Sequence, residues 1–219
     1  MTMTAPTEKL QCRFVYTRLG YSKYLSHLDM IGVITKAVRR ASLPYAITAG
    51  ITPRAVISFG PPLPLGHESL CEFFILDLTE SIDPEEAKER LSEELPEGVI
   101  ITEAIFPYSR RRQPNKGEMV EYELFFTTEK ACEMAQNFLC PNRVFELESK
   151  GKLKAYSMEK ALQSIARNDR DGLFILKVQF FQSIPDAPSV SKISTALERH
   201  LQEDEESIFL IRRLSITSL

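Results

Sequence analysis

The chain has 219 residues, of which 43% are hydrophobic and 26% are charged, and its formal net charge is −3. This composition is typical of a globular protein with one large or two small domains. No apolar run approaches the roughly 20 residues of a membrane-spanning helix, and the polar N-terminus lacks the apolar core of a signal peptide. We therefore expect a cytoplasmic protein that has no membrane among its partners.

In the first part of the chain, a strand pattern is followed by a helix pattern. Residues 11–19 alternate apolar and polar side chains as a strand does, and Gly20 ends the pattern. A helix is predicted to begin at Ser26, which can form a capping box with Asp29, and Pro44 stops it. The apolar stripe expected on this helix consists of Leu28, Ile31, Ile34, Val38 and Ala41.

Two strands, a second helix and a further strand complete the first half. The strands are predicted at 55–59 and 71–78, with the proline-rich turn 60–66 between them. Asp83, followed by a proline and two acids, is a strong helix start. Residues 98–106 form the closing strand. The resulting order β-α-β-β-α-β is the ferredoxin-like arrangement.

The second half repeats this order of elements. Strands are predicted at 119–127, 143–149, 172–181 and 208–217, helices after Thr128 and Ser189, and a helical insertion near 158–167. The sequence therefore predicts an α+β protein of two tandem ferredoxin-like (βαββαβ) units with antiparallel sheets. The units are expected at residues 10–107 and 118–219, joined by a basic linker at 108–117.

The cysteines and histidines exclude a local metal motif. Four cysteines are scattered without a CxxC pair, and three histidines lie far apart along the chain. A zinc motif and an iron–sulfur cluster both need closely spaced ligands, so neither is expected. The cysteines are predicted to be free thiols of a reducing compartment, and we expect the chain to hold no metal and no cofactor.

Charge is segregated along the sequence. Residues 9–66 hold eight basic residues and one acid, Asp29, whereas residues 67–106 hold twelve acids and two basic residues. A further basic cluster follows at 110–112. A field of one sign suits an anionic partner such as RNA. The alternative is that the two blocks neutralise each other in the folded protein.

The start of the first predicted helix carries candidate functional groups. His27 would occupy the first helical position, where the dipole favours a neutral imidazole that can act as a base; alternatively, it is a surface or packing residue. The free N–H groups of this helix start, together with Ser26 and His27, can bind an anion. Nearby aromatic and basic residues are of the kind that stacks on RNA bases and neutralises phosphates. They are Tyr16, Tyr21, Tyr24, Arg18 and Lys23.

Several motifs of the first half occur in a recognisable order. They are Tyr24-Leu25-Ser26-His27-Leu28-Asp29, Arg39-Arg40-Ala41 with Leu43-Pro44, Gly50-Ile51-Thr52-Pro53-Arg54 before Ile57-Ser58-Phe59, and Pro64-Leu65-Gly66 with Glu68-Ser69. In these motifs the chain resembles the radical SAM-linked proteins, a bacterial family with a domain of unknown function. Its members are fused to, or encoded beside, a radical SAM protein with a cobalamin-binding-type domain. The first helix is also similar to that of ferredoxin-like RNA-processing proteins of CRISPR systems.

The resemblance implies a radical SAM/cobalamin-type partner, which would hold the iron–sulfur and cobalamin chemistry. The chain departs from the family at the pattern Phe-Asn-Pro-His-Pro, where Arg54 replaces the histidine. A mechanism with two histidines is thereby disfavoured, whereas an arginine can bind a phosphate with two hydrogen bonds.

These observations together predict a non-catalytic accessory protein. It would bind RNA or another phosphate-rich anion and work with its radical SAM partner in RNA modification or processing. Two alternatives stay open: a metal-independent endoribonuclease that uses His27, and a protein-docking module that uses the acidic residues 67–106. The residues expected to bind the anion are Lys23, Tyr24, Ser26, His27, Lys36, Arg39, Arg40, Thr52, Arg54, Arg110, Arg111 and Arg112.

Overall fold

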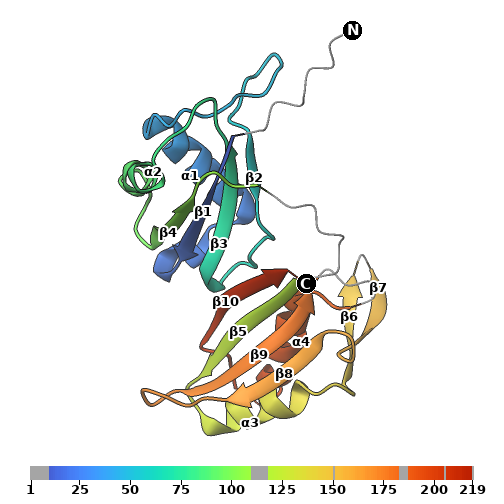
Figure 1. The fold of residues 1–219 in the computed structure, drawn as a ribbon. Helices are drawn as coiled ribbons and strands as arrows, with labels where there is room; N and C mark the ends of the chain where they lie inside the picture. Colours follow the sequence, from blue (N-terminus) through green and yellow to red (C-terminus); the bar gives the residue numbers. More distant parts are fainter. Residues whose placement is uncertain (1–9, 110–117, 150, 183–186, 205, 219) are drawn as a thin grey trace. The chain divides into compact units, whose positions relative to one another are not determined.

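The computed structural model describes residues 10–109, 118–149, 151–182, 187–204 and 206–218. The chain forms two compact units: unit 1 comprises residues 1–65 and 69–112, and unit 2 comprises residues 66–68 and 113–219. Both units combine α-helices with antiparallel strands (Figure 1), so the predicted α+β class is confirmed. Residues 110–117 of the predicted linker lie outside the described residues.

The elements of unit 1 follow one another in the order β-α-β-β-α-β, with a short 3₁₀ turn before the first helix. They are β1 (Gln11–Arg18), η1 (Gly20–Tyr24), α1 (His27–Arg40), β2 (Ile57–Phe59), β3 (Glu68–Asp77), α2 (Pro84–Ser92) and β4 (Val99–Ile105). The strands lie side by side in the order β4-β1-β3-β2, and each adjacent pair is antiparallel.

The core of unit 1 lies between its sheet and both helices. Phe14 of β1 and Phe74 of β3 are fully buried, and their rings stack with centroids 5.0 Å apart. Ala87 and Leu91 of α2 belong to the same cluster as these rings, and so does the buried stripe of α1. Because alternate side chains of a strand point to opposite faces, both helices cover the same face of the sheet.

The start of α1 agrees with the sequence prediction, but its buried face differs. Ser26 Oγ accepts a hydrogen bond from the backbone N–H of Asp29 at 3.1 Å, and the Asp29 carboxylate accepts one from the Ser26 N–H at 3.1 Å, which completes the capping box. Leu28, which was expected in the core, is 77% exposed. Ile34, Val38 and Ala41 are buried as predicted, Ile31 is half-buried, and Met30 and Ala37 complete the buried stripe, so the stripe is rotated slightly from the predicted one.

Unit 2 contains a four-stranded sheet, a separate hairpin and two helices among its described residues. They are β5 (Glu118–Phe126), α3 (Glu129–Phe138), β6 (Val144–Ser149), β7 (Lys152–Ser157), β8 (Leu162–Arg167), β9 (Phe174–Gln182), α4 (Val190–Gln202) and β10 (Leu210–Ser218). The main sheet has the order β10-β5-β9-β8, and β6 pairs only with β7 among the described strands. Nowhere in the described ranges is a helix both long and apolar enough to span a membrane.

The helical insertion predicted near 158–167 is wrong. Residues 162–167 form β8, which pairs with β9 at the edge of the main sheet. The register shifts between Leu162 and Ser164, so a bulge interrupts the two-residue period that would have indicated a strand. The strand predicted at 143–149 exists as β6, but it turns back at Gly151, whose φ of 72° suits a tight turn, and pairs with β7.

Candidate functional site

A groove of about 530 Å³ runs along α1 in unit 1. One wall is α1, and the other wall is formed by β2 and the loop that precedes it. The larger apolar and aromatic groups of its lining are Leu28, Ile31, Tyr45, Ile47, Ile57 and Phe59. Three cations, Lys36, Arg39 and Arg54, also line it, and all three side chains are exposed. The groove thus combines an apolar wall with a positively charged rim.

Local structure explains how these side chains meet. Leu28, Lys36 and Arg39 lie on one stripe of α1, beside the stripe that is buried in the core. The opposite loop is closed on itself: the Thr48 N–H donates to the Arg54 carbonyl at 2.8 Å, and the Arg54 N–H donates to Thr48 Oγ1 at 3.1 Å. Ile47 and Ala55 form an antiparallel bridge in the same loop. The backbone that carries Arg54 is therefore fixed beside α1.

Among the described residues, no aspartate or glutamate lines this groove, although Lys36 also lines a neighbouring pocket that contains Glu93 and Glu94. Across the described part of the chain, the side chains of Lys36, Arg39 and Arg54 form no ion pair with an acid. An unbalanced cluster of three cations beside an apolar surface attracts an anion, because the surface lowers the local dielectric constant and water screens the charges less.

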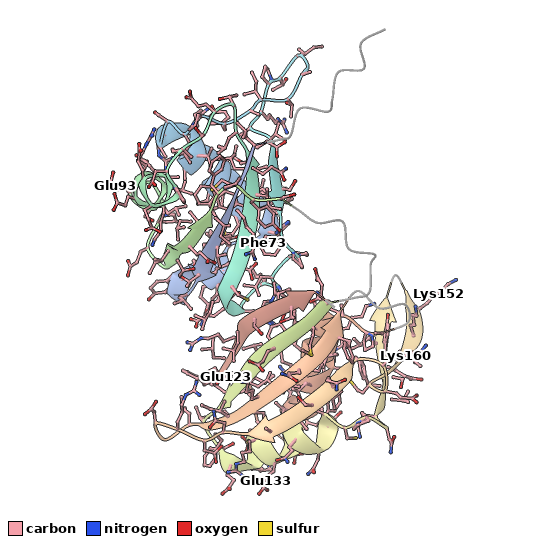
Figure 2. All side chains as sticks on the ribbon, in the orientation of Figure 1. Phe73, Glu93, Glu123, Glu133, Lys152 and Lys160 are labelled. Atoms are coloured by element: carbon pink, nitrogen blue, oxygen red, sulfur yellow. The ribbon has the colours of Figure 1, made fainter. Side chains whose placement is uncertain are left out.

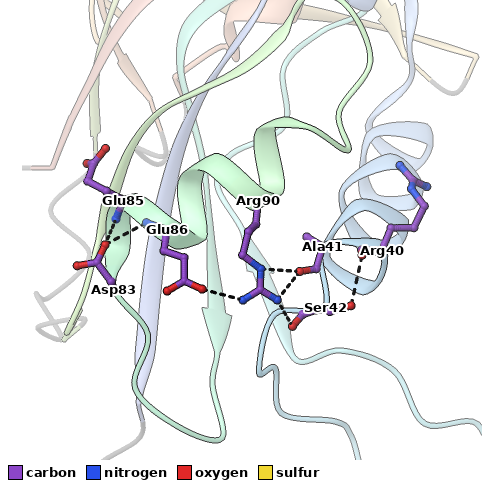
Figure 3. A network of polar contacts seen from close by, with 7 residues as sticks. All are labelled: Arg40, Ala41, Ser42, Asp83, Glu85, Glu86 and Arg90. Atoms are coloured by element: carbon purple, nitrogen blue, oxygen red, sulfur yellow. Dashed lines mark hydrogen bonds and ion pairs between the residues drawn. The ribbon is translucent and has the colours of Figure 1, made fainter.

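Arg40, which was also expected to bind the anion, lies outside this groove. Its Nε is 2.5 Å from Glu94 Oε2, and its guanidinium also donates to the Glu94 carbonyl. Arg90 of α2 donates to the carbonyls of Ala41 and Ser42 at the end of α1, as Figure 3 shows. Arg90 thus connects the C-terminal end of α1 to α2, and Arg40 connects it to the residues just after α2. Arg40 is therefore paired, whereas its neighbour Arg39 lines the groove.

The N-terminus of α1 holds a carboxylate of its own. The Asp29 carboxylate accepts hydrogen bonds from the hydroxyl of Ser26 at 2.6 Å and from its backbone N–H, and these bonds lower the pKa of Asp29. A phosphate placed on Ser26 would therefore meet a negative charge. His27 is half-buried, with its ring edge-on to Phe59 at 6.2 Å between centroids. It forms no hydrogen bond or ion pair with another described residue, so the structure supplies no acid–base partner for it.

The other predicted binding residues are dispersed. Thr52 is exposed on the loop but does not line the groove. Lys23 and Tyr24 belong to η1, where the Lys23 ammonium lies 5.3 Å from the centre of the Tyr24 ring. Arg110, Arg111 and Arg112 lie outside the described residues.

Sequence reasoning missed the apolar wall of the groove and misjudged one cation. Tyr45, Ile47 and Phe59 had no expected role. One signal was available, because Leu28 is apolar but lies outside the best helical stripe, which indicates an apolar surface beside the core. Arg18, counted with the aromatic and basic RNA-binding mixture, is only 2% exposed. Its Nε donates to the Ser22 carbonyl at 2.9 Å, so it supports the η1 turn instead.

The comparisons with known proteins assign the chain to one family. Residues 11–203 match the model of a family described as an uncharacterized protein conserved in bacteria (DUF2344), and the chain belongs to this family. A comparison with curated proteins gave no match.

Three solved structures illustrate the similarity found at the level of coordinates. A chain of a Cbf5-Nop10-Gar1 complex has a TM-score of 0.46 and 8% identity over 95% of this chain, which spans 49% of that chain. An unknown protein from Galdieria sulphuraria has a TM-score of 0.29 and 14% identity, covering 97% of this chain and 99% of its own. A putative glycine cleavage system transcriptional repressor has a TM-score of 0.28 and 10% identity, covering 96% of this chain and 99% of its own. At these TM-scores, none of the three carries an inference about this chain.

Proposed function

We propose that this protein is a non-catalytic accessory protein that binds RNA in the groove along α1. One observation carries the proposal: Lys36, Arg39 and Arg54 line a groove that has an apolar wall and no acid among its described lining residues. RNA phosphates would lie against the three cations. Sugars and bases would lie against the apolar wall, where aromatic groups such as Phe59 and Tyr45 offer flat surfaces.

Two further parts of the proposal go beyond the groove. We infer that both units are ferredoxin-like, because each main sheet follows the same relative order, β4-β1-β3-β2 in unit 1 and β10-β5-β9-β8 in unit 2. We also propose a radical SAM/cobalamin-type partner that performs the chemistry on the RNA. That partner is supported by the motif resemblance of residues 24–69 and by the lack of an acid–base partner for His27 among the described residues.

Salt-dependent titration of a single-stranded RNA tests the proposal. Each phosphate neutralised on a single strand contributes about −0.7 to the slope of log K against log salt, so three groove cations predict a slope of about −2. Arg39→Gln should make the slope shallower by about 0.7 and weaken binding several-fold, because one phosphate contact is lost.

The neighbouring Arg40→Gln is the matched control, because Arg40 pairs with Glu94 outside the groove. It removes the same charge from the next residue and should leave the slope of the RNA titration close to that of the parent protein. Equal slopes for the parent protein and for folded Arg39→Gln would remove RNA binding in this groove as the proposed function. Site-specific RNA cleavage that is lost in His27→Ala would favour the endoribonuclease instead.

A further inference from the structure

The η1 turn, which leads into α1, carries two exposed tyrosines. Tyr21 is 89% exposed and Tyr24 is 62% exposed. Neither hydroxyl forms a hydrogen bond with a described residue. Tyrosine rings usually bury much of their apolar surface, so two large rings held in solvent within four residues call for a functional explanation.

The buried side chain of Arg18 stabilises this turn through hydrogen bonds to its backbone carbonyls. Arg18 donates from Nε to the Ser22 carbonyl at 2.9 Å, and its guanidinium also donates to the Leu25 carbonyl. The hydroxyl of buried Ser22 donates to the Leu19 carbonyl at 2.7 Å, and the Leu19 N–H donates to the Gly98 carbonyl at 2.8 Å. Both tyrosines are therefore attached to backbone that is already ordered.

Gly98 makes this close packing feasible. Its φ is 83°, and a Cβ atom at this position would collide with the Leu19 carbonyl oxygen. Only a glycine therefore lets the start of β4 lie directly against the turn. A surface that is ordered before a ligand arrives loses little conformational entropy on binding.

We propose that Tyr21 and Tyr24 form a stacking platform for unpaired bases of the RNA. The inference rests on the proposed function, which it deepens by naming single-stranded RNA as the ligand class. Aromatic rings stack on the flat face of any unpaired base, whereas the bases of a duplex already stack on each other. The Lys23 ammonium lies over one face of the Tyr24 ring, and when a base stacks there it can move to the adjoining phosphate.

The platform and the groove are close enough for one short RNA segment to contact both. Leu28 of the groove follows Tyr24 by four residues, which span at most about 14 Å of chain. A single-stranded RNA with its phosphates at Lys36 and Arg39 can therefore extend towards the N-terminus of α1 and place bases on the η1 turn. The RNA would then be bound by two separate contributions, charge in the groove and stacking on the turn.

A single introduced tryptophan can report stacking directly. The chain contains no tryptophan, so Tyr24→Trp places the only indole of the protein on the proposed platform. Titration with a single-stranded RNA oligonucleotide should quench the indole fluorescence, because a stacked base quenches it. Inorganic polyphosphate should bind the groove cations without quenching, and the same RNA annealed as a duplex should quench little.

Affinity measurements on tyrosine variants complete the test. Tyr21→Ala with Tyr24→Ala should weaken binding of single-stranded RNA about tenfold or more, because stacking on each base is worth roughly fivefold to a hundredfold. Polyphosphate binding should stay unchanged. Tyr21→Phe with Tyr24→Phe should bind RNA as the parent protein does, because the rings are kept.

The failure of the platform is distinguishable from the failure of the proposed function. If the double alanine variant binds RNA normally while Arg39→Gln does not, the platform is overturned and the groove stands. If the parent protein binds polyphosphate and RNA equally well and RNA does not quench the indole of Tyr24→Trp, stacking is likewise overturned. If the parent protein binds no RNA at all, both proposals are overturned.

Discussion

The α1 groove of unit 1 and one sheet face of unit 2 both carry several cations, but those of unit 2 are paired with acids and those of the groove are not paired with any described acid. On the face of the unit 2 sheet that is turned away from α3 and α4, Arg170 binds Glu123 through two hydrogen bonds of 2.9 and 2.7 Å. Lys177 pairs with Glu121 at 3.0 Å on the same face. Figure 2 shows Glu123 on the strands and Glu133 on α3. In the groove, none of the three cations has such a partner among the described residues.

This difference separates cations that stabilise the fold from cations that are available to a ligand. The guanidinium of a paired arginine is hydrogen-bonded to a carboxylate in place of water, so a phosphate would have to displace that carboxylate before binding. An exposed arginine without a partner keeps only water, which a phosphate displaces more easily. The count of basic residues in a segment is therefore a poor guide to anion binding, and the pairing of each residue is a better one.

The largest expected effect comes from breaking a pair in unit 2. Glu123 is only 4% exposed, so Arg170→Ala leaves a buried carboxylate without its two charge-assisted hydrogen bonds. We expect a loss of about 1.5–3 kcal/mol in the free energy of unfolding, the range for hydrogen bonds to charged groups. Urea unfolding measures it. Arg199→Ala, at an exposed position of α4 that is unpaired with any described residue, is the control and should cost less than about 0.5 kcal/mol. Equal losses for the two variants would contradict the structural role of the pair.

A smaller effect, which depends on pH, is expected at the start of α1. Hydrogen bonds from the Ser26 hydroxyl and N–H lower the pKa of the Asp29 carboxyl in the folded protein. A carboxyl whose pKa is lower in the folded state stabilises the fold above its unfolded pKa, which is about 3.9. This contribution is lost as the pH falls through the folded value.

The parent protein should therefore be more stable than Asp29→Asn at pH 7, and the difference should shrink when the pH falls below about 4. Urea unfolding at pH 7, 4 and 3 measures it. The same comparison in a Ser26→Ala background is the control. There the difference should change less with pH, because one of the hydrogen bonds that lower the pKa is absent. An unchanged pH profile in that background would show that Ser26 does not tune Asp29.

The sequence predicts those parts of the fold that depend on neighbouring residues. The capping box of Ser26 and Asp29 and the Asp83 cap of α2 involve residues within three positions of each other, so both could be read directly. Strand β8 could not, because the bulge between Leu162 and Ser164 breaks the alternation that identifies a strand.

The candidate site was harder to predict because its composition depends on distant contacts. Arg40 and Glu94 are 54 positions apart, so nothing near Arg40 in the sequence indicates that its charge is paired. Arg18 lies near the end of a strand pattern, but its burial follows from the way the η1 turn folds back over it. The charge segregation of the first half therefore indicated a basic region without telling which of its cations are paired.

The smallest expected change in stability is also the most direct test of the comparison. Arg39 is exposed, lines the groove and forms no ion pair with a described acid, so Arg39→Ala should change the free energy of unfolding by less than about 0.5 kcal/mol. The same variant should bind single-stranded RNA several-fold more weakly. Arg170→Ala should show the opposite pattern, with reduced stability and unchanged RNA affinity when measured where the variant is folded. If Arg39→Ala instead destabilised the protein as much as Arg170→Ala and left RNA binding intact, Arg39 would be a structural cation. The proposed difference between the groove cations and the paired cations of unit 2 would then be wrong.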